Sequence, residues 1–99
     1  MVKTINEQIA DKCSKIRDLL TKKNEAYGNS ALNPLRIFSK AGFIEQIKVR
    51  IDDKLSRLYR GTNQDLVPED TLQDLIGYLI LLQIAQDTLN VIQESIHKP

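Results

Sequence analysis

The sequence predicts an all-α fold, a helical bundle of three main helices that is completed by oligomerisation. Apolar residues recur at the 3.6-residue spacing of a helix in three segments, and no segment shows the alternation that is typical of a strand. A chain of 99 residues has room for only one domain. Residues 1–99 are therefore expected to form a single helical domain.

The first helix is expected over residues 4–25. Thr4 can cap its N-terminus, with Glu7 three residues later as in a capping box. The stretch YGNSALNP then collects turn-forming residues and ends the helix near Gly28. Its apolar stripe, in which Cys13 is expected to be a small core residue, consists of Ile5, Ile9, Cys13, Ile16 and Leu20.

A short helical turn near residues 34–40 and a second main helix over residues 42–60 follow. Pro34 suits the first position of the turn, because proline lacks only an N–H that a helix start leaves unpaired. Gly61 supplies the end of the second helix. The apolar stripe of that helix consists of Ile44, Ile47, Ile51, Leu55 and Leu58.

The third helix is expected over residues 68–96, with Pro68 at its start and acidic residues in its first turn. Within it the segment LIGYLILLQIA, residues 75–85, is apolar on nearly every side. Such a helix is buried all round, and two partner helices in a chain of this size can hardly cover it. The sequence therefore predicts a homo-oligomer.

Composition excludes several classes of protein. A single cysteine forms no internal disulfide, and one histidine with one cysteine cannot build a zinc site or a Cys–His pair within one chain. The N-terminus MVKTINEQ lacks the pattern of a signal peptide. The sequence contains no unbroken run of about 18 apolar residues, so no membrane span is expected. A net charge of +1 argues against a broad nucleic-acid surface. We expect a cytoplasmic protein without a membrane partner.

The charge is segregated along the chain. Residues 36–60 carry seven basic and three acidic side chains, whereas residues 61–99 carry one basic and six acidic ones. A stripe on the second helix holds Arg50, Asp53, Lys54 and Arg57, and a stripe on the third holds Asp70, Asp74 and Tyr78. The two stripes can meet across one seam, either as a plain salt-bridge network or as part of a binding site. Asp74 favours a site, because a carboxylate beside so apolar a segment needs partners.

The turn after the first helix offers a second set of candidates. Tyr27 presents an aromatic face on which a base can stack, and Arg36 and Lys40 suit phosphate oxygens. Asn29 and Ser30 add short polar side chains next to Gly28, and Lys22 and Lys23 belong to the same set. A plain turn with a solvated basic rim is the alternative interpretation. The motif GxxxxGK[ST] of a P-loop is absent from the sequence.

Three blocks of the sequence, KKNEAYGNSA, IKVRIDDKLSRL and PEDTLQDLIGYLILL, resemble the nucleotide modification-associated domain 1 family of small helical phage and bacterial proteins. The three blocks span residues 22–82, most of the chain, in the order of the family. The resemblance implies involvement with nucleotides, in the host cytoplasm if the chain is encoded by a phage. A more distant similarity is to the all-helical pyrophosphohydrolases of the MazG type, which hold magnesium with clustered acidic residues. This chain lacks their E-E-x-x-E pattern.

Taken together, the residues and the resemblance predict a protein that binds a small nucleotide-type ligand and needs no cofactor. It would serve nucleotide modification or sequester a cyclic-nucleotide or ADP-ribose-type immune signal. The alternative is a magnesium-dependent nucleoside triphosphate pyrophosphohydrolase with Asp53, Asp70 and Asp74 as metal ligands. A third interpretation is a purely structural module. The expected ligand-binding residues are Tyr27, Asn29, Arg36, Lys40, Arg50, Asp53, Lys54, Arg57, Asp74 and Tyr78.

Overall fold

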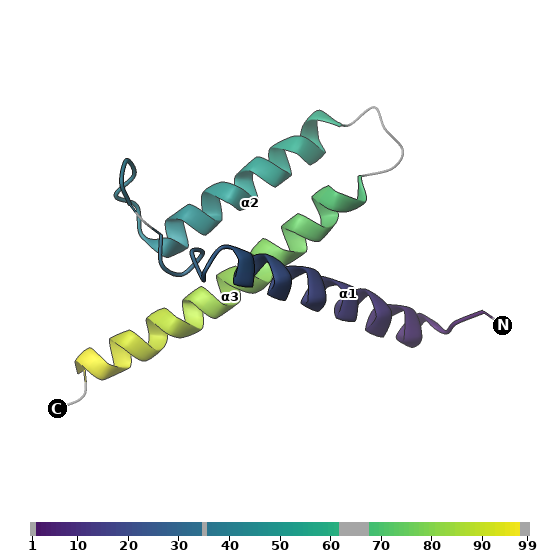
Figure 1. The fold of residues 1–99 in the computed structure, drawn as a ribbon, viewed down its shortest axis with the longest axis horizontal. Coiled ribbons are helices and arrows are strands. Elements are labelled where there is room, and N and C mark those ends of the chain that lie inside the picture. The colour runs from purple at the N-terminus through teal and green to yellow at the C-terminus, as the bar shows by residue number, and fades with distance from the viewer. Residues whose placement is uncertain (1, 35, 62–67, 98–99) are drawn as a thin grey trace.

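A computed structural model describes residues 2–34, 36–61 and 68–97 of the chain. They form three α-helices, α1 (Ile5–Ala26), α2 (Phe43–Arg60) and α3 (Glu69–His97). The all-α prediction is confirmed, and each helix begins and ends within one residue of its expected bounds. α2 and α3 run antiparallel side by side, while α1 crosses α3 near its middle (Figure 1).

The start of α1 is fixed by the capping box that the sequence predicts. The backbone N–H of Glu7 donates to Thr4 Oγ1 at 3.1 Å, and the backbone N–H of Thr4 donates to Glu7 Oε1 at 3.3 Å. Two of the N–H groups that a helix start leaves unpaired are thereby satisfied by side chains of the helix itself. α3 starts without such a box, and the carbonyl of Pro68 accepts from the backbone N–H of Leu72 at 3.3 Å.

α1 ends in a Schellman motif, which turns the chain sharply after Tyr27. Gly28 and Asn29 have φ angles of 60° and 61°, in the left-handed region. The N–H of Gly28 donates to the Glu25 carbonyl at 3.4 Å, and that of Asn29 to the Asn24 carbonyl at 3.2 Å. These are the two hydrogen bonds that define the motif. Tyr27 is thereby held at the last turn of α1.

Replacing Gly28 with alanine is expected to destabilise the fold by about 1–2 kcal/mol, because a Cβ disfavours the left-handed region. No heavy atom lies within 4 Å of the position that a Cβ at Gly28 would take, so the loss is one of backbone conformation alone. Urea unfolding followed by circular dichroism measures it. Gly28→Asn is the control, because asparagine tolerates this conformation better. An equal loss in both variants would contradict the argument.

The helical turn expected near residues 34–40 is not formed by the described residues of that segment, 34 and 36–40, and this prediction was wrong. Arg36 has a φ of 59°, which is incompatible with a right-handed turn. The Lys40 ammonium donates to the Arg36 carbonyl at 3.1 Å, at the place where a helix would use the backbone N–H of Lys40. Arg36 Nε in turn donates to the Ala41 carbonyl at 3.2 Å. Both cations therefore hold the backbone of this segment.

The three helices enclose a small core. Among the described residues the buried apolar side chains are Ile16, Ile47 and Ala85. Cys13, expected in the core, is exposed, because it lines an open groove between α1 and α3. The radius of gyration is 16.6 Å, against about 13 Å for a compact chain of this length. Much of the apolar stripes of α1 and α3 is therefore left uncovered within one copy of the chain.

α1 meets α3 at Gly77, which is buried. A Cβ at this glycine would lie 3.4 Å from Leu20 Cδ1, so the two helices approach each other closely here. Gly77→Leu is expected to cost about 1–3 kcal/mol of unfolding free energy, because the larger side chain has no room at the crossing.

Gly77→Ala serves as the control for this crossing. A methyl group meets only the flexible end of Leu20, and alanine favours a helix by about 1 kcal/mol over glycine. We therefore expect stability equal to that of the wild type or slightly higher in thermal unfolding. A loss as large as that of Gly77→Leu would contradict the close approach.

α3 is apolar enough over its length to be compared with a membrane-spanning helix, although the sequence has no unbroken run of about 18 apolar residues. By length and composition, its residues 69–96 form one helix that could cross a membrane. Core helices of soluble proteins have the same length and composition, so these two properties alone do not assign α3 to a membrane.

Candidate functional site

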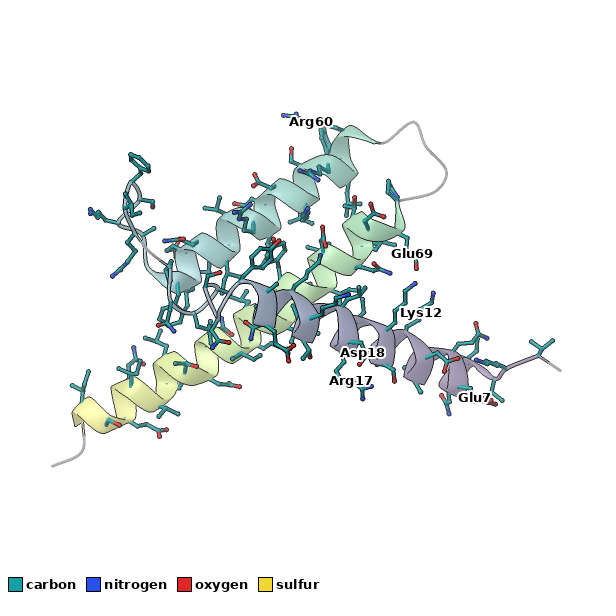
Figure 2. The ribbon with its side chains drawn as sticks, in the orientation of Figure 1. Glu7, Lys12, Arg17, Asp18, Arg60 and Glu69 are labelled. Atoms are coloured by element: carbon teal, nitrogen blue, oxygen red, sulfur yellow. The ribbon has the colours of Figure 1, made fainter. Side chains whose placement is uncertain are left out.

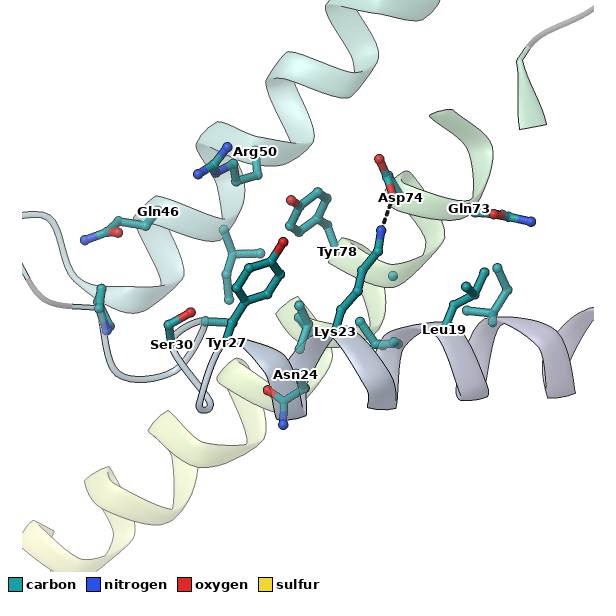
Figure 3. Close-up of a pocket in the computed structure, with 17 residues that line it drawn as sticks. Leu19, Lys23, Asn24, Tyr27, Ser30, Gln46, Arg50, Gln73, Asp74 and Tyr78 are labelled. Carbon is teal, nitrogen blue, oxygen red and sulfur yellow. Dashed lines mark hydrogen bonds and ion pairs between the residues drawn. The ribbon is translucent and has the colours of Figure 1, made fainter. Parts of the chain in front are cut away.

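A pocket of about 560 Å³ lies between α1, the turn that follows it, α2 and α3 (Figure 3). Its volume is in the range of small-molecule sites. The apolar part of its lining includes Ile16, Leu19, Leu20, Ile47 and Leu81. The polar part consists of Lys23, Asn24, Tyr27, Ser30, Gln46, Arg50, Gln73, Asp74 and Tyr78.

Helical spacing brings these side chains together. Lys23 follows Leu20 by three residues and Ile16 by seven, so it shares the α3-facing side of α1 with them. Gln46 and Arg50 lie one turn apart on α2, as do Asp74 and Tyr78 on α3. Each helix thus contributes polar residues that stand in line with its apolar stripe.

Asp74 lies between two ammonium groups from two different helices. Lys23 Nζ of α1 donates to Asp74 Oδ1 at 2.9 Å, and Lys54 Nζ of α2 lies 3.0 Å from Asp74 Oδ2. Burial opposes ionisation of Asp74, but the hydrogen bonds from Lys23 and Lys54 outweigh it and hold its pKa below the ordinary value. The hydrogen bond to Asp74 likewise raises the pKa of Lys23. Asp74 therefore connects all three helices.

The seam expected between the basic stripe of α2 and the acidic stripe of α3 is formed by Lys54 and Asp74. The side chains of these two residues are 13% and 24% exposed, respectively. Lys23 belongs to the basic residues around the turn that the sequence singled out, but it was not among the ten expected ligand-binding residues, and its pairing with Asp74 was not expected. The signal that could have found it is its position on the apolar stripe of α1, where a lysine needs a carboxylate partner.

Two tyrosines and one arginine complete the polar lining. Tyr27, at the end of α1, and Tyr78, on α3, both project into the space between the three helices (Figure 3). Arg50 reaches the pocket from α2, and within the described part of the chain it forms no ion pair. Aromatic faces and an unpaired guanidinium in one pocket suit a ligand that combines a flat ring with an anionic group.

Four of the ten expected ligand-binding residues line this pocket: Tyr27, Arg50, Asp74 and Tyr78. Lys54 stands behind them as a partner of Asp74. The other five, Asn29, Arg36, Lys40, Asp53 and Arg57, are exposed and do not belong to the lining. Asn29 Oδ1 accepts from Asn24 Nδ2 at 2.6 Å, on the side of a second groove between α1 and α3.

The alternative metal site is not assembled. Of Asp53, Asp70 and Asp74, only Asp74 lines the pocket. The part of the chain that the structure describes contains no group of three His, Cys, Asp or Glu residues placed to hold a metal ion. Both oxygens of Asp74 also face ammonium groups, which would compete with a magnesium ion.

A second ion-pair cluster lies outside the pocket, where α1 passes the start of α3. Lys15 Nζ donates to Glu69 Oε1 at 2.9 Å, and Lys12 Nζ lies 4.0 Å from the same oxygen. Figure 2 shows Lys12 directed toward Glu69, with Arg17 and Asp18 on the other side of α1. The hydrogen bond from Lys15 lowers the pKa of Glu69. This cluster is exposed and offers no enclosed space to a ligand.

Comparisons of the chain with protein-family models, with curated proteins and with solved structures find no match. The resemblance of the three sequence blocks to a nucleotide-associated family thus stays a prediction.

Proposed function

We propose that the protein binds a small nucleotide-type anion in the pocket between α1, α2 and α3. The observation that carries the proposal is the presence of Tyr27, Tyr78 and Arg50 in the lining of one pocket of about 560 Å³. A base would stack on a tyrosine ring, and a phosphate would bind the guanidinium of Arg50. Ser30, on the turn after α1, supplies a hydroxyl for the ribose.

The balance of charge around the pocket favours an anion. Lys23 and Lys54 surround a single carboxylate, that of Asp74, and Arg50 adds a third cation. Within the described part of the chain, one negative charge thus stands against three positive charges. A phosphate group supplies the missing negative charge and accepts hydrogen bonds from Arg50 in a bidentate geometry.

Binding without turnover is the function that this chemistry supports best. Among the described residues that line the pocket, Asp74 is the only carboxylate. Its lowered pKa makes it a weak general base at neutral pH. We therefore propose that the ligand is held intact, as in sequestration of a cyclic-nucleotide or ADP-ribose-type signal. In a phage-encoded protein that role would oppose a host immune response, and nucleotide modification would use the same pocket.

Calorimetric titration with AMP, ADP, cyclic dinucleotides and ADP-ribose tests the proposal, with adenosine and inorganic phosphate as controls. We expect at least one nucleotide to bind more tightly than either control, and mass spectrometry to recover it unchanged. A ligand at 100 times its Kd should stabilise the fold by about 2.7 kcal/mol. Absence of binding by every nucleotide would contradict the proposal. Magnesium-dependent release of pyrophosphate from an added nucleoside triphosphate, such as ATP, would favour the hydrolase instead.

A further inference from the structure

One copy of the chain exposes far more surface than its mass requires. Its accessible surface is 8309 Å², whereas a compact protein of its mass exposes about 5,700 Å². The difference is about 2,600 Å² for one copy and about 5,200 Å² for two, which reaches the upper end of the total area that obligate homodimers bury. The surface left open is therefore large enough for a stable dimer.

The open apolar surface includes two helix segments that extend beyond the crossing of α1 and α3. We name them the α1 arm (residues 3–17) and the α3 arm (residues 84–96). Ile5 and Ile9 of the α1 arm are 69% and 55% exposed, and Ile92 and Ile96 of the α3 arm are 45% and 71% exposed. Each pair is spaced by four residues, so each arm presents an apolar stripe.

The arms carry opposite charge. Asp87 and Glu94 are the only charged side chains of the α3 arm. The α1 arm has two acidic residues, Glu7 and Asp11, against four basic ones. Within one copy Lys3 pairs with Asp11 and Arg17 with Asp18, whereas Lys12 and Lys15 share the single carboxylate of Glu69, which leaves one ammonium charge in excess there. Among the described residues Asp87 and Glu94 form no ion pair, so their charges are available to a partner. An α1 arm therefore complements an α3 arm better than either arm complements itself.

The arms also point to opposite ends of the molecule. In Figure 1 the N-terminus lies at one end of the long axis and the C-terminus at the other, and that axis is 58 Å long. A twofold axis perpendicular to it would bring the α1 arm of each copy to the α3 arm of the other, at both ends. Such a contact closes on itself and leaves no open surface for further growth.

We propose that a second copy of the chain covers these arms, with each α1 arm packed on the α3 arm of the other copy. The dimer would bury Ile5, Ile9, Ile92 and Ile96 and would place Asp87 and Glu94 near the lysines of the α1 arm. The interface is separate from the proposed ligand pocket, because none of these six residues lines that pocket.

Sedimentation equilibrium tests the proposal on the full chain. We expect a mass near twice 11.3 kDa at micromolar concentration. Ile9→Lys and Ile92→Glu should each shift that mass toward the monomer, because each change alters both contacts of a twofold dimer. Ile37→Lys is the control, since Ile37 is exposed but belongs to neither arm. Circular dichroism should show that the helices remain, because Ile9 and Ile92 are already half exposed in one copy.

Mixing the two variants distinguishes this arrangement from other dimers. In the mixed dimer one of the two contacts is unaltered, and in the other contact the introduced lysine faces the introduced glutamate. Native mass spectrometry should therefore show the mixed dimer in excess over either homodimer. Pairing of like arms would give no such rescue. A wild-type mass near 11.3 kDa would overturn the proposal. Co-sedimentation of the wild type with phosphatidylcholine vesicles would also overturn it, because a membrane would then cover the apolar surface.

Discussion

Replacing Asp74 with asparagine is expected to lower the free energy of unfolding by about 1–3 kcal/mol at pH 7, the range for hydrogen bonds to charged groups. Asparagine keeps the size of the side chain but removes the charge that Lys23 and Lys54 share. Most of the loss is expected at Lys54, because only 13% of its side chain is exposed and water can replace the lost carboxylate only in part. Urea unfolding at fixed protein concentration measures the loss.

The stability difference between wild type and Asp74→Asn should depend on pH. The pKa of Asp74 is lowered in the folded state, so its charge stabilises the fold above the pKa of the unfolded chain, about 3.9. That contribution is lost as the pH falls through the lower pKa of the folded state. The pKa of Lys23 is raised, so its contribution is lost only in strongly alkaline solution. The difference in unfolding free energy between wild type and Asp74→Asn should therefore have its full size near pH 7 and decrease below about pH 4.

Two other acidic residues of α3 provide matched controls. Asp70 lies one turn before Asp74 but is exposed and forms no ion pair among the described residues. Glu69 pairs with Lys15, but its side chain is 60% exposed. Asp70→Asn and Glu69→Gln should both be less destabilising than Asp74→Asn, because exposed ion pairs contribute little. Equal losses in all three variants would show that the position of Asp74 between the helices has no special effect.

Replacing Arg50 with alanine is expected to weaken nucleotide binding at least tenfold, a change of about 1.4 kcal/mol. The guanidinium of Arg50 lines the pocket and is not engaged by a described carboxylate, so it is available to a phosphate. Arg57→Ala is the matched control, because Arg57 lies on the same helix but outside the lining. Its Kd should change less than twofold. Calorimetric titration of the tightest nucleotide gives both values.

The same titration tests the proposed stacking. Tyr27→Ala should also weaken binding of the nucleotide, because base stacking on an aromatic ring contributes about 1–3 kcal/mol. Tyr59→Ala is its control, since Tyr59 is an exposed tyrosine of α2 outside the pocket. A loss for Arg50→Ala without a loss for Tyr27→Ala would show that the pocket binds a phosphate without stacking a base. Equal effects of the pocket variants and their controls would contradict the proposed site.

The sequence was sufficient to predict the three helices, because their signals are local. The capping box of Thr4 and Glu7, the left-handed turn at Gly28 and the end at Gly61 each act within one helical turn. The segment 34–40 was mispredicted because its local signal, Pro34, does not decide the path of the chain. Pro34 permits a helical turn, but the left-handed Arg36 and the hydrogen bonds of the Arg36 and Lys40 side chains favour a different path.

The site was only partly predictable, because it depends on how the helices cross. Helical spacing on α2 and α3 predicted that their charged stripes could meet, and Lys54 and Asp74 form that contact. No spacing within one helix could show that α1 crosses α3 at Gly77 and brings Lys23 to the same carboxylate. The crossing also explains why Arg57 and Asp53 stay outside the pocket, whereas Arg50, one or two turns nearer the start of α2, lines it.

The contact between Lys23 and Asp74 links the attachment of α1 to the occupancy of the pocket. Lys23 holds α1 to α3 through Asp74, and it also lines the space that a phosphate would enter. A bound phosphate and Asp74 would therefore compete for one ammonium group. Binding of a ligand in the pocket should therefore change the hydrogen-exchange rates of the α1 backbone amides. These rates report how often α1 detaches from the other two helices. In such a protein the same lysine sets both how tightly the ligand is held and how firmly the first helix is anchored.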